Sequence, residues 1–167
     1  MLKGLTLING MVFVTRLIHA DAIDLLRAQF NQVDVWESPF PPTRTELIER
    51  TQGCIALIAM LTDTVDAAFL EAVPDLKAIS NLAVGHDNLD TAAARSRGVL
   101  LGSTPWFLTE ATADLAFALL LTVARRVKEA ADAAIGGSWG PWHPQGWLGQ
   151  DVHDSVLGVV GLDRIGL

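Results

Sequence analysis

Short apolar runs alternate with amphipathic segments along the first two thirds of the chain. The runs have the length and β-branched content of buried strands, and they fall at residues 12–16, 33–36, 54–60, 77–81 and 99–101. Helical spacing of apolar residues marks 21–30, 43–51, 65–73 and 89–97. Thr43 is the expected N-cap of the second helix, with Glu46 completing a capping box, and Gly98 closes the fourth. This alternation predicts a doubly wound α/β fold with a parallel sheet of five strands.

A different pattern begins at residue 102. Residues 102–105 predict a turn or hinge, and 109–134 predict one long helix rich in Ala and Leu. Its most apolar part, 115–124, falls short of the roughly 20 residues of a membrane span and predicts a buried helix. Residues 136–147 hold three Trp among Gly and Pro, so we expect an irregular arm whose indoles pack on a partner subunit or, alternatively, on their own chain. Residues 156–160 predict a further buried strand.

The glycines after this last strand follow most of a dinucleotide-binding pattern, Gly-x-Gly-x-x-Gly. In that pattern the first glycine makes a tight turn, the second lets backbone approach the pyrophosphate, and the third lets the helix pack on the strand. Gly161 and Gly166 occupy the outer positions. Asp163 occupies the middle one, where it adds a side chain and a negative charge next to the phosphate position. The turn is therefore either a damaged cofactor site or a chance likeness.

Length and charge limit the number of domains and the kinds of partner. The 167 residues suit one complete α/β domain and part of another, which we place at 11–103 and 104–167. Residues 1–10 lack the features of a signal peptide and are expected to be a start-codon overextension or a loose leader. A net charge of -7 without a basic cluster argues against nucleic acid and anionic membrane as partners. The single cysteine, Cys54, lies in an apolar run, so we expect a packed thiol in a cytoplasmic protein.

Candidate chemistry lies in the loops that follow the strands 54–60 and 77–81, because open parallel sheets bind ligands at the carboxyl ends of their strands. Residues 82–88 offer consecutive backbone N–H groups around Gly85, a concavity suited to a carboxylate. The alternative is an ordinary strand-to-helix loop in which Asp87 or Asn88 caps the next helix. Residues 61–63 are expected to face the same cleft.

The histidines suggest neither a metal site nor an acid–base pair. His19, His86, His143 and His153 have no metal-ligand spacing, and none has a neighbouring carboxylate placed to orient it as a general base. We predict no metal site.

Several motifs stand in a specific order: Asn-Leu-Ala-Val-Gly-His-Asp-Asn-Leu-Asp at 81–90, Thr-Pro at 104–105, Leu-Thr-Glu-Ala-Thr-Ala-Asp-Leu-Ala at 108–116, Arg-Arg at 125–126, the tryptophan arm, and Gly-Leu-Asp-Arg-Ile-Gly at 161–166. From about Met11 to the end, this order resembles the D-isomer-specific 2-hydroxyacid dehydrogenases, and within them the glyoxylate/hydroxypyruvate reductases. The resemblance implies a flavodoxin-like substrate domain, followed by the long helix and first strand of a truncated Rossmann domain. It also implies reduction of a small 2-oxo acid to the 2-hydroxy acid by hydride transfer from NAD(P)H.

The resemblance assigns roles to individual residues. The Val84–Gly85 backbone pair holds the substrate carboxylate, Leu61 lines the same pocket, and Trp142 reaches the active site of a neighbouring subunit, which implies a homodimer through the arm at about 136–150. The residues expected to contact NAD or NADP are Thr112, Gly161, Leu162, Asp163, Arg164, Ile165 and Gly166.

Other parts of the family pattern are not in this sequence. The catalytic Arg, Glu and His of such enzymes come later in the chain than Leu167, as do the residues that choose between NAD and NADP. Without a general acid and a polarising Arg, we expect the 167-residue chain to be inactive alone. The alternative is a non-catalytic oligomerising or small-anion-binding α/β module, or an inactive remnant of such an enzyme.

Overall fold

A computed structural model describes residues 7–167 of the chain. The chain is divided into two compact units, Met1–Pro105 and Trp106–Leu167. Their boundary lies two residues beyond the one expected at 103/104.

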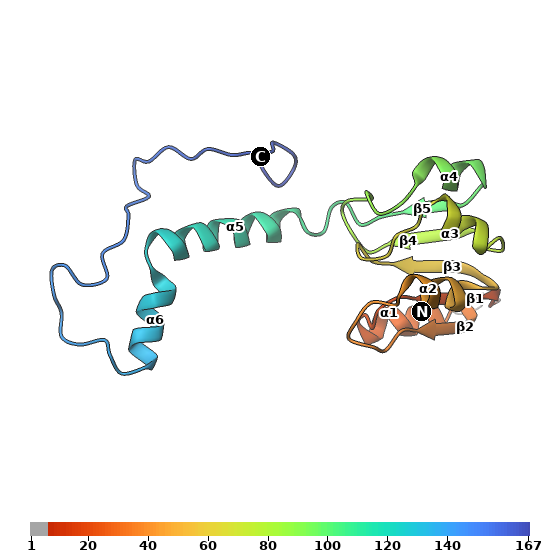
Figure 1. Cartoon of the computed structure of the whole chain (residues 1–167), viewed down its shortest axis with the longest axis horizontal. Coiled ribbons are helices and arrows are strands. Elements are labelled where there is room, and N and C mark those ends of the chain that lie inside the picture. Colours follow the sequence, from red (N-terminus) through yellow and green to blue (C-terminus); the bar gives the residue numbers. More distant parts are fainter. Residues whose placement is uncertain (1–6) are drawn as a thin grey trace. The chain divides into compact units, whose positions relative to one another are not determined.

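Five parallel strands form the centre of the first unit (Figure 1). They are β1 (Ile8–Val14), β2 (Phe30–Val35), β3 (Cys54–Ala59), β4 (Ala78–Asn81) and β5 (Leu100–Gly102). Their order in the sheet is β2-β1-β3-β4-β5, and every neighbouring pair is parallel. This is the strand order of flavodoxin-like folds, so the fold predicted from the alternating pattern is confirmed.

Four helices connect these strands: α1 (Ala20–Arg27), α2 (Arg44–Thr51), α3 (Ala67–Ala72) and α4 (Thr91–Ser96). Successive side chains of a strand point to opposite faces of the sheet, and β1 shows the consequence. Phe13 joins a buried cluster that includes residues of α2, α3 and α4. Val12 and Val14 join a second cluster with Ile23 of α1. β1 is therefore apolar at consecutive positions because both of its faces are covered.

Local capping fixes where the helices begin. Thr43 accepts from the Glu46 N–H while the Glu46 carboxylate accepts from the Thr43 N–H, which confirms the predicted capping box. Asp66 and Asp90 cap α3 and α4 by accepting from backbone N–H groups three residues on. These caps place the starts of α3 and α4 two residues later than the sequence pattern alone indicated.

The structure corrects several predicted boundaries in the first unit. β1 begins at Ile8, and the Ile8 N–H donates to Gln29 O, so residues 8–10 belong to the sheet rather than to a loose leader; residues 1–6 lie outside the described part. α1 ends at Arg27 and β2 begins at Phe30, earlier than the expected boundaries at 30 and 33. β5 runs from Leu100 to Gly102, one residue later than predicted.

The second unit contains two helices where one was expected. α5 (Thr109–Ala124) and α6 (Val127–Ile135) are separated at Arg126, whose φ of 54° is left-handed and stops the helical ladder. The Ala124 carbonyl, freed at this break, accepts from the Gln150 N–H at 2.7 Å. The prediction of a continuous helix over 109–134 is therefore wrong.

Two further expectations for the second unit are wrong. No residue of α5 is buried, and Phe117 is 57% exposed, because no other described element of this unit covers the helix. Residues 156–160 do not form a strand, because no described strand lies beside them to satisfy their backbone N–H and C=O groups.

Candidate functional site

Two loops meet at the carboxyl edge of the first unit's sheet. One follows β3 and contains residues 60–66, and the other follows β4 and contains residues 82–90. The Val65 N–H donates to Asn88 O at 2.9 Å, and the Asp90 N–H donates back to Val65 O at 2.8 Å. This pairing places the loops that contain residues 61–63 and 82–88 side by side at one edge of the sheet, as expected from the sequence.

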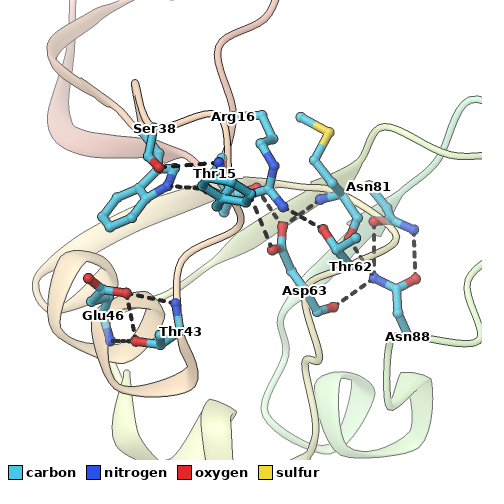
Figure 2. Close-up of polar contacts among 12 residues, drawn as sticks. Thr15, Arg16, Ser38, Thr43, Glu46, Thr62, Asp63, Asn81 and Asn88 are labelled. Carbon is cyan, nitrogen blue, oxygen red and sulfur yellow. Dashed lines mark hydrogen bonds and ion pairs between the residues drawn. The ribbon is translucent and has the colours of Figure 1, made fainter.

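Asp63 is the buried polar centre of this edge (Figure 2). Its Oδ2 accepts from the Thr15 hydroxyl, at the end of β1, and from the Met60 N–H at 2.7 Å. Arg16 lies beside it, with a guanidinium nitrogen 4.0 Å from Oδ1, and donates to the Thr62 hydroxyl at 2.7 Å. The ends of β1 and β3 are therefore tied together through one carboxylate.

Asn88 and Asn81 extend this network to the second loop (Figure 2). The Asn88 amide nitrogen donates to Met60 O at 3.0 Å and to Asp63 O at 2.9 Å. The buried Asn81 amide nitrogen donates to Asn88 Oδ1 and to Gly85 O, both at 3.0 Å. The interpretation of Asn88 or Asp87 as the cap of the following helix is wrong, because Asp90 caps α4.

Val84 and Gly85 present unused backbone donors. Within residues 7–167, neither N–H has a hydrogen-bond partner. Gly85 is exposed, and a Cβ built on it would meet nothing closer than Asp87 Oδ2, at 3.9 Å. Two adjacent N–H groups without partners are donors that a carboxylate can use. The nearby Leu61 side chain, 63% exposed, belongs to the loop after β3.

Sequence reasoning found the loop but missed the residues that hold it. Thr15, Asp63, Asn81 and Asn88 act through tertiary contacts between three strand ends. The available signal was positional, because Thr15 and Asn81 are polar residues at the ends of apolar strands.

Two other side chains singled out from the sequence are not arranged for catalysis. His86 is exposed and forms no ion pair within the described part of the chain. Cys54 is buried as predicted; burial raises the pKa of its thiol to about 11, the Asp34 carboxylate adds to the rise, and Arg50 opposes it. The thiol is therefore protonated at neutral pH and is not a nucleophile.

The tryptophan arm folds partly on itself. Trp139 and Trp147 stack with ring centroids 5.7 Å apart, and Arg126 lies 5.7 Å from the Trp147 ring. Trp142 points outward and is 86% exposed. Two of the three indoles thus find partners within the unit, as the alternative for this segment anticipated.

The backbone of the turn at 161–166 requires glycine at both outer positions. Gly161 has a φ of 94°, and a Cβ on Gly166 would lie 2.2 Å from Gly161 O. The Asp163 carboxylate, however, accepts from the Ile165 N–H at 3.0 Å and the Gly166 N–H at 3.2 Å. Those N–H groups are the donors that a phosphate would use. As it stands, this turn does not fit a dinucleotide pyrophosphate, since an internal anion already fills its cradle.

The remaining cofactor-contact candidates also belong to the second unit. Thr112 is exposed in the first turn of α5. A hollow of about 460 Å³ is lined by Ala113, Phe117 and Leu120 of α5 and by residues of the 157–166 segment, including Asp163 and Ile165. The Arg164 guanidinium lies 3.5 Å from the centre of the Trp106 ring, so its charge is turned onto an indole.

Two other kinds of feature are absent from residues 7–167. No three His, Cys, Asp or Glu side chains in that range are grouped as metal ligands would be. No helix within it has the length and apolar character to cross a membrane.

Comparison with known proteins identifies the family. Residues 12–140 match the family model of the D-isomer specific 2-hydroxyacid dehydrogenase catalytic domain. The chain belongs to this family. A relative named glyoxylate reductase, from Korarchaeum cryptofilum, is 45% identical over 156 residues, which cover 93% of this chain and 47% of the relative. A second glyoxylate reductase, from Thermococcus litoralis, is 43% identical over 93% of this chain and 48% of its own length.

Solved structures agree on the dehydrogenase fold. A crystal structure of a Thermus thermophilus protein superposes with a TM-score of 0.87 at 44% identity, covering 93% of this chain and 50% of its own. The NADPH-dependent glyoxylate/hydroxypyruvate reductase of Sinorhizobium meliloti, solved with NADP and malonate, shares the fold with a TM-score of 0.70 at 24% identity, over 94% of this chain and 47% of its own. This chain spans about half the length of the dehydrogenases that it matches.

Proposed function

We propose that this chain is the N-terminal part of an NAD(P)-dependent D-2-hydroxyacid dehydrogenase that reduces glyoxylate or hydroxypyruvate. The observation that carries the proposal is the pair of unpartnered N–H groups at Val84 and Gly85, at the carboxyl edge of a flavodoxin-like sheet. The family membership and the two glyoxylate reductases above 40% identity support it.

The part of the reaction that this chain serves is substrate binding. The carboxylate of the 2-oxo acid accepts hydrogen bonds from the Val84 and Gly85 N–H groups, and the exposed Leu61 side chain forms an apolar wall beside it. Holding the carboxylate at two fixed donors orients the neighbouring carbonyl, and such positioning is a large part of catalysis in bimolecular reactions.

The cofactor proposed for the whole enzyme is NAD or NADP, contacted by Thr112 and by the turn at 161–166. A nicotinamide cofactor serves members of this family and supplies the hydride when bound. Because Asp163 fills the phosphate cradle of this chain's turn, we expect nucleotide binding by the 167 residues to be weak.

Assembly and location are proposed on the sequence and the exposed arm. We expect a homodimer formed through residues 136–150, in which the outward-pointing Trp142 contacts the partner subunit near its active site. The single, buried, reduced Cys54 agrees with a cytoplasmic location.

Two measurements on the purified chain test this function. In a titration of ¹⁵N-labelled chain with glyoxylate, the amide signals of Val84 and Gly85 should shift first. In an assay with glyoxylate and NADH or NADPH, we expect the chain to cause no loss of reduced-cofactor absorbance, because the resemblance places the family's catalytic Arg, Glu and His later in the chain than Leu167. Shifts confined to other residues would contradict the substrate site, and turnover would contradict the proposed inactivity.

A second candidate function has one specific observation in its favour. Because Asp163 occupies the N–H donors that a cofactor phosphate would use, the chain could be an inactive remnant of the enzyme. It could equally be a non-catalytic module that binds small anions or oligomerises. Labelled chain that co-purifies with an intact reductase would support an origin from the reductase. Association only with itself, without a response to glyoxylate, would favour the non-catalytic module.

A further inference from the structure

The side-chain amides of Asn81 and Asn88 pair across the base of the proposed carboxylate loop. Their orientation is unambiguous, because each amide nitrogen faces a backbone carbonyl, which only accepts hydrogen bonds. Asn81 donates to Gly85 O, and Asn88 donates to Met60 O and Asp63 O. Asn81 is fully buried, so its amide cannot reach a substrate itself.

These bonds determine which way the loop's peptide planes face. The chain has no cis peptide among the described residues, so each C=O points opposite to the N–H of the following residue. Gly85 O is held inward by Asn81 at 3.0 Å, which directs the His86 N–H away from the buried amide. Ala83 O is held by the Thr104 N–H at 2.8 Å, which directs the Val84 N–H away from Thr104.

Three consecutive donors are left unused by this arrangement. The N–H groups of Val84, Gly85 and His86 have no partner within residues 7–167. A carboxylate has enough acceptor sites on its two oxygens for all three. The His86 imidazole is not needed for this contact, since the backbone provides it.

We propose that Asn81 and Asn88 are positioning residues for the substrate carboxylate, and that they fix the Gly85–His86 peptide so that the His86 N–H acts as a third donor beside those of Val84 and Gly85. This proposal rests on the proposed function, in which the loop binds a 2-oxo acid. It goes beyond it by adding a donor and by giving the buried amide pair a task other than stability.

The first test needs no variant and uses oxalate, an unreactive dicarboxylate, as the probe. In the ¹⁵N-labelled 167-residue chain, saturating oxalate should shift the amide signals of Val84, Gly85 and His86 with one common affinity. Shifts at Val84 and Gly85 without one at His86 would overturn the third donor while leaving the proposed substrate site intact. No shift at any of the three would reject the carboxylate site and this proposal together.

The second test removes the donors beneath the loop. Asn88→Asp keeps the size of the side chain but cannot donate to Met60 O or Asp63 O, and Asn81→Asp cannot donate to Gly85 O. Each should weaken oxalate binding about tenfold or more, because the backbone N–H groups that bind the charged ligand are then no longer held in position. Each should also speed amide hydrogen exchange at His86.

A matched control is available at the opposite end of the sheet. Asn31 also bridges two strands through its amide, donating to Asn9 Oδ1 and accepting from the Gly10 N–H, both at 2.9 Å. Asn31→Asp should change the urea midpoint without changing oxalate affinity. If the folded Asn88→Asp chain bound oxalate as tightly as the unaltered chain, the pair would be structural only. Asn88 is only partly buried, so this variant is the decisive one should Asn81→Asp fail to fold.

Discussion

Replacing Asp63 with Ala should be one of the most damaging single changes to the first unit. The carboxylate is 2% exposed and accepts from the Thr15 hydroxyl and the Met60 N–H. Its removal leaves the fully buried Thr15 hydroxyl without its acceptor, and takes away the carboxylate that faces the Arg16 guanidinium at 4.0 Å.

The expected magnitude follows from these contacts. Each buried donor left unsatisfied costs about 1–3 kcal/mol, so two such donors imply a loss of about 2–6 kcal/mol. The lower half of that range is more realistic, because Asp63 Oδ1 has no hydrogen-bond partner within residues 7–167 and its desolvation already opposes folding. We therefore expect a loss of about 2–4 kcal/mol.

Urea denaturation of the 167-residue chain measures this loss through the midpoint and slope. Asp63→Asn should fall between the unaltered chain and Asp63→Ala, because an amide oxygen still accepts from Thr15 and Met60 while the charge opposite Arg16 is lost. The exposed Asp75 provides the control, since Asp75→Ala should stay within about 0.5 kcal/mol. A loss from Asp63→Ala no larger than that of the control, or equal losses for the two Asp63 variants, would refute the reasoning.

Four further outcomes are expected. Gly85→Ala should leave the urea midpoint nearly unchanged, because its Cβ meets only open space, but should abolish the amide shifts caused by glyoxylate; retained shifts would place the carboxylate elsewhere. Asp163→Gly should strengthen NADH binding in fluorescence titrations by freeing two N–H donors, and an unchanged affinity would show that the turn is misplaced. Burial raises the pKa of Cys54 to about 11, so iodoacetamide should label the thiol slowly at neutral pH and quickly in urea; equal rates would contradict its burial. Hydrogen bonds from Arg44 and, to a smaller extent, from the Phe69 N–H lower the pKa of Asp66. The small stabilising contribution of this carboxylate is therefore present above the unfolded-state pKa of about 4 and is lost as pH falls through the folded-state pKa. The stability difference between the unaltered chain and Asp66→Asn should accordingly shrink in acid.

The amino-acid sequence by itself determines the local elements of the first unit. The Thr43–Glu46 capping box is a contact between residues three apart, and the apolar run at 54–60 identifies a buried strand without reference to the rest of the fold. The position of the loop after β4 was also predictable, because a segment that follows a buried strand must lie at the carboxyl edge of a parallel sheet. Segments that depend on neighbours were not predictable. Residues 156–160 have strand composition, but no strand of the described part of the chain lies beside them. The helix break occurs at Arg126, a left-handed residue that is not a glycine.

Only the tertiary structure decides how the candidate site is held. Asn88 was open to interpretation as a helix cap, since its local sequence suits that role as well as any other. In the fold it bonds to Met60 and Asp63, which lie 28 and 25 residues away along the chain. Asp163 shows the same dependence, because the sequence reveals a charge near the phosphate position but not that the carboxylate takes the N–H donors for itself. Propensity and periodicity describe contacts within a few residues, whereas the donors and acceptors of this site become neighbours only when three parallel strands end at one edge of the sheet.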